Sequence, residues 1–272
     1  MLKLMYITND PKVAVIAADA GVDRIFVDME VRGKAERQGG MDTVQSHHVP
    51  EDILRVREAI GDRAEIVTRI NPLYEGTEKE IEIVLRNGSD WVMLPMWKTV
   101  EELRRFCEIV DGRARTIPLL EHIDAVRVLD EALEVSGIDE MFIGLNDLHL
   151  SLYQRFMFEP LADGMVEELG KKIQISGIPF GFGGIGRPGR GLLPATYIMG
   201  EHFRLGSSSV ILSRSFCNIN HMTDYDEIEE VFRSGVRAVR EEEKIISHWT
   251  EMEFEQNRQR VQECVHQILL VC

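Results

Sequence analysis

Short apolar runs alternate with longer segments of helical period along most of the chain. The runs are rich in Val, Ile and Phe, which favours strands, whereas the segments between them repeat apolar residues every three or four positions, which favours helices. This alternation predicts parallel strands joined by crossover helices. We expect eight strands, which begin near Lys3, Arg24, Glu65, Asp90, Thr116, Glu140, Ile178 and Phe203.

The spacing of these strands predicts a closed barrel. Most successive strands begin about 25 residues apart, which is enough for a strand, a helix and two short loops. Eight such units predict an α/β fold, the (β/α)8 TIM barrel. A doubly wound open sheet is the alternative, but it normally carries a glycine-rich phosphate-binding turn after its first strand. Here that strand is followed by Thr8-Asn9-Asp10-Pro11, which is typical of a helix start.

The last part of the chain has a different pattern. Residues 224–272 are polar and helical, with apolar positions such as Ile228, Phe232 and Val239 on one face. We therefore expect a barrel domain over residues 1–223 and a C-terminal helical extension over residues 224–272. The apolar stripe of this extension should pack on the barrel or on a neighbouring subunit.

Composition excludes several classes of protein. The chain of 272 residues has 31 Lys and Arg against 46 Asp and Glu, a net charge of −15, which argues against nucleic acid or an anionic membrane as a partner. The four cysteines are scattered without a CxxC motif, which is typical of a reducing cytoplasm. No apolar run approaches the roughly 18 residues that a membrane span needs. The expectation is a cytoplasmic globular protein.

Charged residues cluster directly after the predicted strands, and in a barrel these positions share one face. Arg69 lies within an apolar strand, where burying a charge is costly unless an anion compensates it. That anion is either Asp28 or Glu30, which end the second strand, or a substrate. Glu121 and Asp147 follow adjacent strands, and either hold Mg²⁺ with water and substrate oxygens or serve as helix caps and arginine partners.

Other candidates for substrate contact are less distinctive. Gly206 and Ser207 are expected at the end of the eighth strand, where their backbone N–H groups would bind an anion or the serine would only cap a helix. His47 and His48 lie in the long loop after the second strand, either solvated or acting as a general base. Further arginines expected at this face are Arg155, Arg187 and Arg190.

Five segments follow one another in a distinctive order. They are Phe26–Glu30, Thr68–Pro72, Val92–Met96, Pro118–Glu121 and Met141–Leu148, with a weaker match from Arg204 to Ser208 and at Arg214. These segments resemble the HpcH/HpaI aldolase and citrate lyase beta-subunit family. The resemblance implies a (β/α)8 barrel in which Glu121 and Asp147 hold a divalent metal, Mg²⁺ or Mn²⁺. It also implies that Arg69 contacts the keto or enolate oxygen of the substrate.

The same resemblance implies an activity and an assembly. The activity is that of a metal-dependent carbon–carbon lyase, or aldolase, that acts on a 2-keto acid through a pyruvate-type enolate. The assembly is a homo-oligomer joined through the C-terminal helices. The residues expected to bind this small anionic keto acid beside Arg69 are Gly144, Asn146, Gly206 and Ser207.

The sequence departs from the family at one catalytic position. Hydroxy-acid aldolases of the family have a histidine directly after the acid that ends the second strand, and this chain has Val31 there. His48 is our candidate for the missing base, and a metal-bound hydroxide is the alternative. Two other functions stay open. One is a citryl-CoA or malyl-CoA type lyase, and the other is a non-catalytic binding or assembly protein that has kept the barrel.

Overall fold

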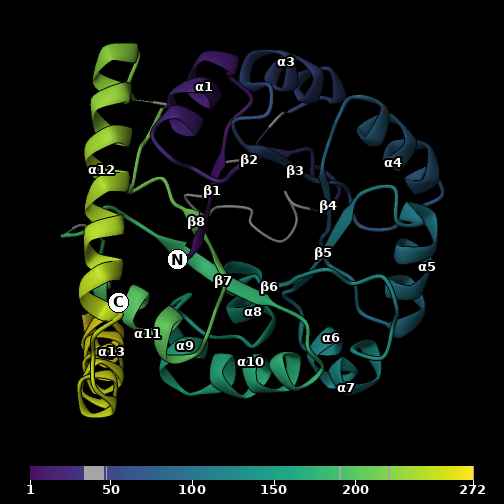
Figure 1. Ribbon diagram of the computed structural model, residues 1–272. Helices are drawn as coiled ribbons and strands as arrows, with labels where there is room; N and C mark the ends of the chain where they lie inside the picture. Colours follow the sequence, from purple (N-terminus) through teal and green to yellow (C-terminus); the bar gives the residue numbers. More distant parts are fainter. Residues whose placement is uncertain (34–45, 47, 190, 220, 272) are drawn as a thin grey trace.

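A closed barrel of eight parallel strands forms the centre of the molecule (Figure 1). The computed structural model describes residues 1–33, 46, 48–189, 191–219 and 221–271. The strands, each paired with the next and with β8 closing on β1, are β1 (Lys3–Ile7), β2 (Arg24–Asp28), β3 (Glu65–Arg69), β4 (Trp91–Leu94), β5 (Arg115–Leu120), β6 (Met141–Ile143), β7 (Phe180–Ile185) and β8 (Ser209–Leu212). The predicted TIM barrel is confirmed.

Helices surround the barrel and follow the strands in the order that the sequence pattern predicts. They are α1 (Pro11–Asp19), α3 (Pro50–Ile60), α4 (Thr77–Arg86), α5 (Val100–Val110), α6 (Ile123–Arg127), α7 (Leu129–Ala132), α8 (Leu145–Ser151), α9 (Glu159–Ala162), α10 (Met165–Ile175), α11 (Ala195–Arg204), α12 (Tyr225–Ile246) and α13 (Glu251–Val271). The predicted start of α1 is confirmed, because the Asp10 carboxylate accepts hydrogen bonds from the N–H groups of Lys12 and Val13.

The eighth strand lies further along the chain than predicted. Phe203 and Arg204 are the last residues of α11, where Arg204 forms ion pairs with Glu201 at 2.7 Å and Glu167 at 2.9 Å. The strand itself is the apolar run Ser209–Leu212. The prediction was wrong because the buried residues of α11 keep a helical spacing as far as His202. The chain turns out of the helix only at Gly206, which has a φ of +66°.

The barrel interior is closed at the end where the strands begin. Arg24 is 4% exposed, and its Nη1 lies 2.8 Å from the Glu140 carboxylate. Its guanidinium also lies 4.1 Å from the centre of the Trp91 ring. Above this layer the interior is apolar, with Met5, Phe26, Val67, Met93, Ile117, Leu119 and Phe142 packed together. Any cavity for chemistry is therefore at the other end, where the strands finish.

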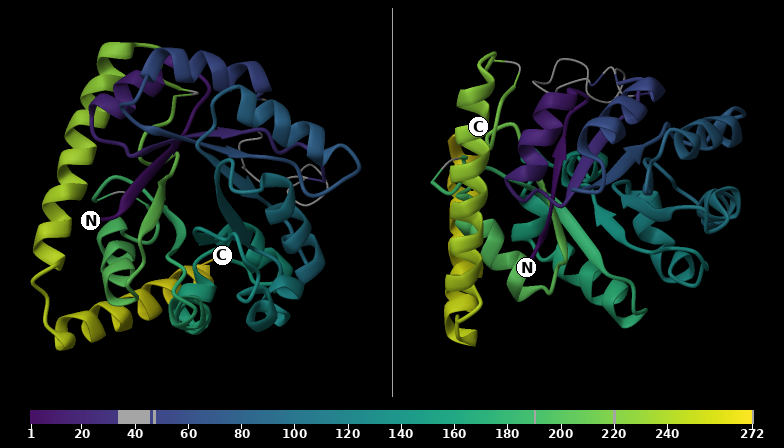
Figure 2. Two further views of the ribbon diagram at one scale, coloured as in Figure 1. Left: turned by 45° about the vertical axis from the view of Figure 1, so that its right-hand side comes forward. Right: turned by 45° about the horizontal axis from the view of Figure 1, so that its top comes forward.

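The two C-terminal helices pack on the barrel (Figure 2). α12 lies along α1, and α13 turns away from it to lie on α11 and α9. The Leu2 N–H donates to the Glu243 carboxylate at 2.6 Å, so α12 also binds the start of β1. The buried Asn257 of α13 donates to the Tyr197 carbonyl and the Glu201 carboxylate, each at 3.0 Å. Asp224 caps α12, and the domain boundary before it stays a prediction.

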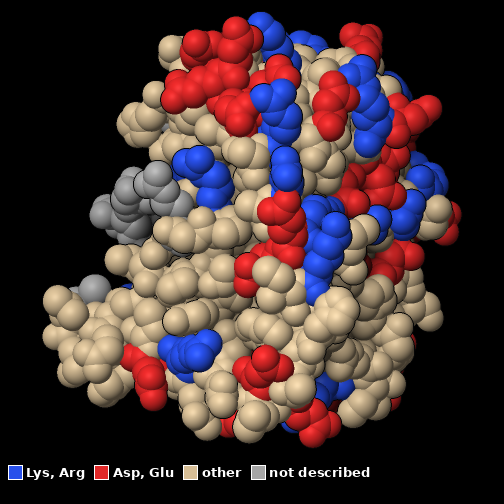
Figure 3. All heavy atoms as spheres, turned by 60° about the vertical axis from the view of Figure 1, so that its left-hand side comes forward, with Lys and Arg blue, Asp and Glu red and all other residues tan. Residues whose placement is uncertain are grey.

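On the face shown in Figure 3, acidic and basic side chains are interspersed over the upper and right-hand parts, and the lower left part carries few charged side chains. Part of this pattern comes from ion pairs within α12, such as Arg233 with Glu230 and Arg237 with Glu241. Exposed pairs of this kind contribute little to stability. Within the described part of the chain, no helix is both long and apolar enough to cross a membrane.

Candidate active site

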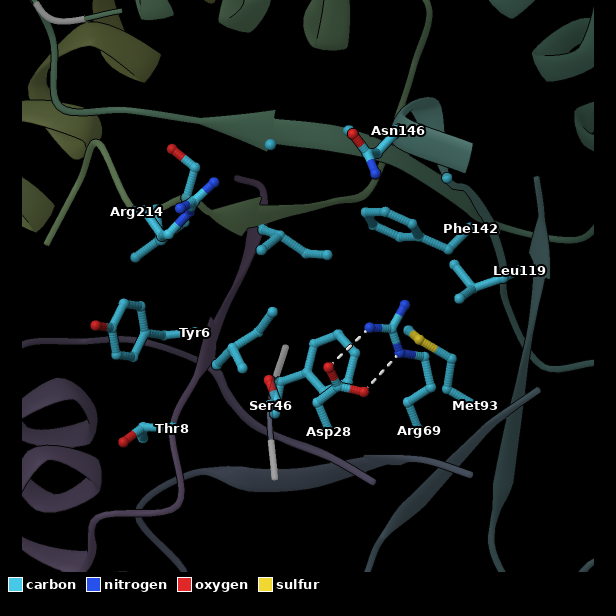
Figure 4. A pocket seen from close by; sticks show the side chains of 18 of the residues that line it. Tyr6, Thr8, Asp28, Ser46, Arg69, Met93, Leu119, Phe142, Asn146 and Arg214 are labelled. Atoms are coloured by element: carbon cyan, nitrogen blue, oxygen red, sulfur yellow. Dashed lines mark hydrogen bonds and ion pairs between the residues drawn. The ribbon is translucent and has the colours of Figure 1, made fainter. Parts of the chain in front are cut away.

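A cavity of about 590 Å³ opens at the carboxyl ends of the barrel strands. Its walls include residues from every strand, of which β7 contributes only Gly183 and Gly184, and its floor is apolar (Figure 4). The charged residues that line it, among those described, are Asp28, Arg69, Glu121, Asp147 and Arg214. The sequence analysis expected the first four of these at one face, and the structure brings them together.

Arg69 is held in a fixed orientation by two acids, Asp28 at the end of the neighbouring strand β2 and Glu30 just beyond it. Its Nε and Nη2 donate to the two Asp28 carboxylate oxygens, each at 2.8 Å, and its Nη1 lies 3.4 Å from Glu30. Parallel pairing of β2 and β3 sets Asp28 directly opposite Arg69. Burial alone would lower the pKa of Arg69, but the charges of Asp28 and Glu30 outweigh it and raise the pKa. Arg69 therefore presents a permanent, oriented positive charge to the cavity.

A hydrogen-bonded turn beyond β2 and β3 positions Glu30. The Asn71 side-chain oxygen accepts from the N–H groups of Val31 and Arg32, each at 3.0 Å, and its amide nitrogen donates to Glu80 at 2.8 Å. Asn71 and Glu80 are both buried. The sequence analysis missed this supporting role, although the position of Asn71 two residues after Arg69 is a signal for it.

Glu121 follows β5 and is 3% exposed. One of its oxygens accepts the Met96 N–H at 2.9 Å, and Met96 adopts a left-handed conformation, with φ of 54°, as it does so. Gly144 allows this arrangement, since a Cβ atom there would lie 2.7 Å from the other Glu121 oxygen. Gly144 was expected to bind substrate, and the structure indicates that its lack of a side chain makes room for Glu121.

Glu121 lies close to two other acids, Asp147 and Glu30. Burial and the charges of Asp147 and Glu30 raise the pKa of Glu121 to about 8, against the opposing charge of Arg69. Asp147 is 6% exposed and occupies the first turn of α8. Two neighbouring buried carboxylates, of which Glu121 has a raised pKa, suit a divalent cation, which would compensate their charge.

The cation would draw its remaining ligands from elsewhere. Within the described part of the chain, no three His, Cys, Asp or Glu side chains are grouped closely enough to hold a metal ion together. A site built on Glu121 and Asp147 alone leaves most coordination positions to water and substrate oxygens, which is the mode typical of Mg²⁺. The residues present therefore fit an Mg²⁺ or Mn²⁺ ion that binds substrate directly.

His48 lies at the cavity beside Asp28. Its Nδ1 accepts the backbone N–H of Asp28 at 3.0 Å, so the neutral ring carries its proton on Nε2. In this arrangement His48 is a hydrogen-bond donor, which differs from the general base that the sequence analysis proposed. His47 lies outside the described residues.

Gly206 and Ser207 lie away from the cavity, contrary to expectation. They precede β8, so they belong to the end of the barrel where strands begin. Ser207 Oγ bonds to His202 Nδ1 at 2.8 Å, and the N–H of the next residue donates to Phe180, the first residue of β7. Their misplacement follows from the misplaced eighth strand. Asn146, by contrast, lines the cavity as expected (Figure 4).

The ends of β8 and β1 form a wall of the cavity that sequence reasoning did not single out. Tyr6, Thr8, Ser213 and Arg214 line it. Arg155, which the sequence analysis expected at this face, instead donates to the Leu269 carbonyl of α13 at 3.0 Å. Arg187 is not among the lining residues, and Arg190 lies outside the described residues.

The sequence pattern of the family described as HpcH/HpaI aldolase/citrate lyase matches residues 3–155. A search of curated proteins finds no match.

Solved structures with the same fold include an HpcH/HpaI aldolase/citrate lyase family protein from Burkholderia cenocepacia, with TM-score 0.62, 15% identity, and coverage of 88% of this chain and 93% of that one. An HpcH/HpaI aldolase from Desulfitobacterium hafniense gives TM-score 0.60, 17% identity and the same coverage, 88% and 93%. The citrate synthase SbnG gives TM-score 0.58, 14% identity, and coverage of 89% and 94%. At these identities the likenesses show a shared fold.

Proposed function

Because this chain belongs to the HpcH/HpaI aldolase/citrate lyase family, we propose that it is a divalent-metal-dependent carbon–carbon lyase, or aldolase, that acts on a 2-keto acid through a pyruvate-type enolate. The family groups aldolases and lyases. One observation on this chain supports the proposal in addition to its membership of the family. Arg69, with its two acids, and the buried pair of Glu121 and Asp147 face the same cavity.

The reaction that suits these residues is a reversible aldol cleavage. In a 4-hydroxy-2-keto acid the bond between C3 and C4 breaks, and its electron pair becomes the enolate. The C4 hydroxyl loses its proton and becomes an aldehyde carbonyl, and C3 of the enolate later gains a proton to give the keto acid. Negative charge therefore develops on the C2 oxygen, and catalysis depends on groups aimed at that oxygen.

Arg69 is the group that we assign to the developing charge. Its guanidinium is oriented before substrate arrives, because Asp28 binds it through two hydrogen bonds of 2.8 Å. Glu30 holds the third nitrogen from the other side. Preorganised donors of this kind cost no reorganisation during the reaction. Asp28 and Glu30 are thus positioning residues for Arg69.

Glu121 and Asp147 would hold the metal, which supplies Lewis-acid stabilisation of the enolate when bound. Asn146 lines the cavity next to Asp147 and would orient the substrate carboxylate. His48 would donate its Nε2 proton in a hydrogen bond to the C4 oxygen. Because Val31 replaces the histidine of related aldolases and His48 Nδ1 is engaged, we assign acceptance of the hydroxyl proton to water in the open cavity.

The proposal also covers the assembly of the enzyme and its location in the cell. We propose a homo-oligomer joined through α12 and α13, because α13 leaves Met252, Leu270 and Val271 largely exposed. We also propose a cytoplasmic location, since Cys107, Cys217 and Cys264 are free thiols and are spaced without a disulfide framework.

Exchange of the pyruvate methyl protons tests the proposal without a second substrate. The protein with Mg²⁺ or Mn²⁺ in deuterated water should replace these protons, followed by NMR. Arg69→Ala should slow the exchange by about 100-fold or more, the usual cost of a lost oxyanion donor. Arg113→Ala, which removes an exposed arginine paired with Glu82, is the matched control and should exchange normally. The proposal is contradicted if neither metal supports exchange, or if Arg69→Ala exchanges the protons at the wild-type rate.

A further inference from the structure

The two acids that hold Arg69 are themselves held in different ways. Asp28 belongs to β2, and the pairing of β2 with β3 sets it opposite Arg69. Glu30 lies beyond the end of β2, where this pairing no longer applies, and its carboxylate lies 3.4 Å from Arg69 Nη1. The Glu30 N–H also donates to the Asp28 carboxylate at 3.3 Å. The position of the turn after β2 therefore affects both acids.

The turn after β2 is bound to one side chain of the loop after β3. Asn71 Oδ1 accepts the N–H groups of Val31 and Arg32, each at 3.0 Å, and these two residues directly follow Glu30. Because both hydrogen bonds end on the same oxygen atom, a rotation of the Asn71 side chain would break them together. The orientation of Asn71 thus fixes the turn and, through it, Glu30.

Glu80 of α4 determines which way the Asn71 amide faces. One Glu80 oxygen accepts the backbone N–H of Asn71 at 3.2 Å and its side-chain Nδ2 at 2.8 Å. Both residues are buried, and an ionised buried carboxylate needs donors and can donate nothing itself. The amide nitrogen therefore faces Glu80 and the amide oxygen faces the turn. Neither Asn71 nor Glu80 is among the residues that line the cavity.

A second contact holds the same turn from the outer side. The Arg32 guanidinium lies 3.9 Å from the centre of the Tyr74 ring, a cation–π contact. Tyr74 precedes α4, and its N–H donates to the Thr77 hydroxyl at 2.9 Å. Gly76 makes room for the ring, since a Cβ atom there would collide with it. The start of α4 and the segment before it therefore hold the turn at two points.

We propose that Asn71 and Glu80 are positioning residues for Arg69, although neither of them reaches the cavity. The contacts run from Glu80 to Asn71, from Asn71 to the turn after β2, and from Asp28 and Glu30 to the guanidinium. A helix outside the barrel thereby takes part in orienting the charge that we assign to the enolate. The effect on the reaction rate rests on the proposed function, whereas the orientation of Arg69 can be measured without substrate.

A pair of substitutions at Asn71 and Glu80 tests this role by loss and recovery. Asn71→Asp sets a second acid against Glu80, and should lower pyruvate proton exchange at saturating pyruvate about 10- to 100-fold, the range found when the outer contacts of a site are lost. The KM for pyruvate should change little, because Arg69 acts on charge that develops during the reaction. Adding Glu80→Gln places an amide donor against the introduced acid, so the double variant should recover most of the rate.

Two further variants complete the design. Asn71→Ala removes the same acceptor without a contact between like charges, and should lower the rate in the same range, so the test does not depend on the folding of one variant. Asn87→Asp is the matched control, because Asn87 Nδ2 donates to the Pro50 carbonyl at 2.9 Å at the other end of α4. This control should exchange the protons at the wild-type rate.

Nitrogen NMR of the substrate-free protein measures the orientation of Arg69 directly. The two Nη atoms of Arg69 should give separate signals in the wild type and in the double variant. They should merge in Asn71→Asp, because a released guanidinium rotates. The inference is overturned if Asn71→Asp keeps the wild-type rate or separate Nη signals, or if the double variant recovers neither. Failure of the proposed function would instead appear as a wild type that exchanges no protons while the NMR differences remain.

Discussion

Gly144→Ala should weaken metal binding, because Gly144 is the residue that leaves room for Glu121. An added Cβ would lie 2.7 Å from a Glu121 oxygen and 2.9 Å from the Glu121 Cβ, whereas ordinary contacts begin at 3.4 Å. The backbone of Gly144, with φ of −83°, accepts alanine without strain. The variant should therefore fold, with the clash relieved by movement of Glu121.

The required movement is large on the scale of metal coordination. Restoring a normal contact shifts the carboxylate by roughly 0.7 Å, and metal sites tolerate about 0.2 Å in ligand distance. Displacement of one of the two proposed protein ligands by this amount should lower Mn²⁺ affinity about 10- to 100-fold, the range found when ligand support is lost. Overpacking should also lower the free energy of unfolding by about 1 to 3 kcal/mol.

Calorimetric titration with Mn²⁺ measures the change, and Gly235→Ala is the matched control. A Cβ at Gly235 would also lie 2.7 Å from a side chain, in this case Phe216 under α12. The control tests the effect of crowding away from the proposed metal ligands, and it should bind Mn²⁺ as the wild type does. Normal Mn²⁺ affinity in folded Gly144→Ala would refute the reasoning.

Two further predictions concern stability. Asp28→Ala removes both hydrogen-bonded oxygens from the buried Arg69 and should lower the free energy of urea unfolding by about 3 to 5 kcal/mol; a loss below 1 kcal/mol would contradict this. Burial lowers the pKa of His202 to about 3, so stability should fall as pH drops below about 6.5, by up to about 1.4 kcal/mol per pH unit. His202→Phe should remove this loss between pH 7 and pH 5, and equal slopes in both proteins would contradict it.

The parts of the site that the sequence predicted are those that follow from strand periodicity. Arg69, Asp28 and Glu30 stand at the ends of apolar runs, and parallel pairing then brings neighbouring strand ends together. Glu121 and Asp147 could be placed on one face for the same reason. The cost of burying the charge of Arg69 predicted a compensating anion, and left open whether this is a neighbouring acid or a substrate.

The parts that escaped prediction depend on contacts between distant segments or on one misplaced boundary. The Met96 N–H reaches Glu121 only because the backbone there is left-handed, and nothing in a methionine indicates this. Arg214 could not be assigned to the cavity while the eighth strand was placed before Gly206. The error moved Gly206 and Ser207 to the wrong end of the barrel, because helix and strand signals overlap in short apolar runs.

The buried layer of Arg24, Glu140 and Trp91 determines from which side molecules can reach the candidate active site. Since this layer closes one end of the barrel, reactants and products share a single entrance at the other. A molecule bound near that entrance blocks access to anything beneath it. For the proposed aldol reaction, this arrangement predicts that the keto acid binds before the acceptor in condensation, and that the aldehyde leaves before the keto acid in cleavage. The binding order of the proposed reaction would then be set by the end of the barrel that lies away from the candidate site.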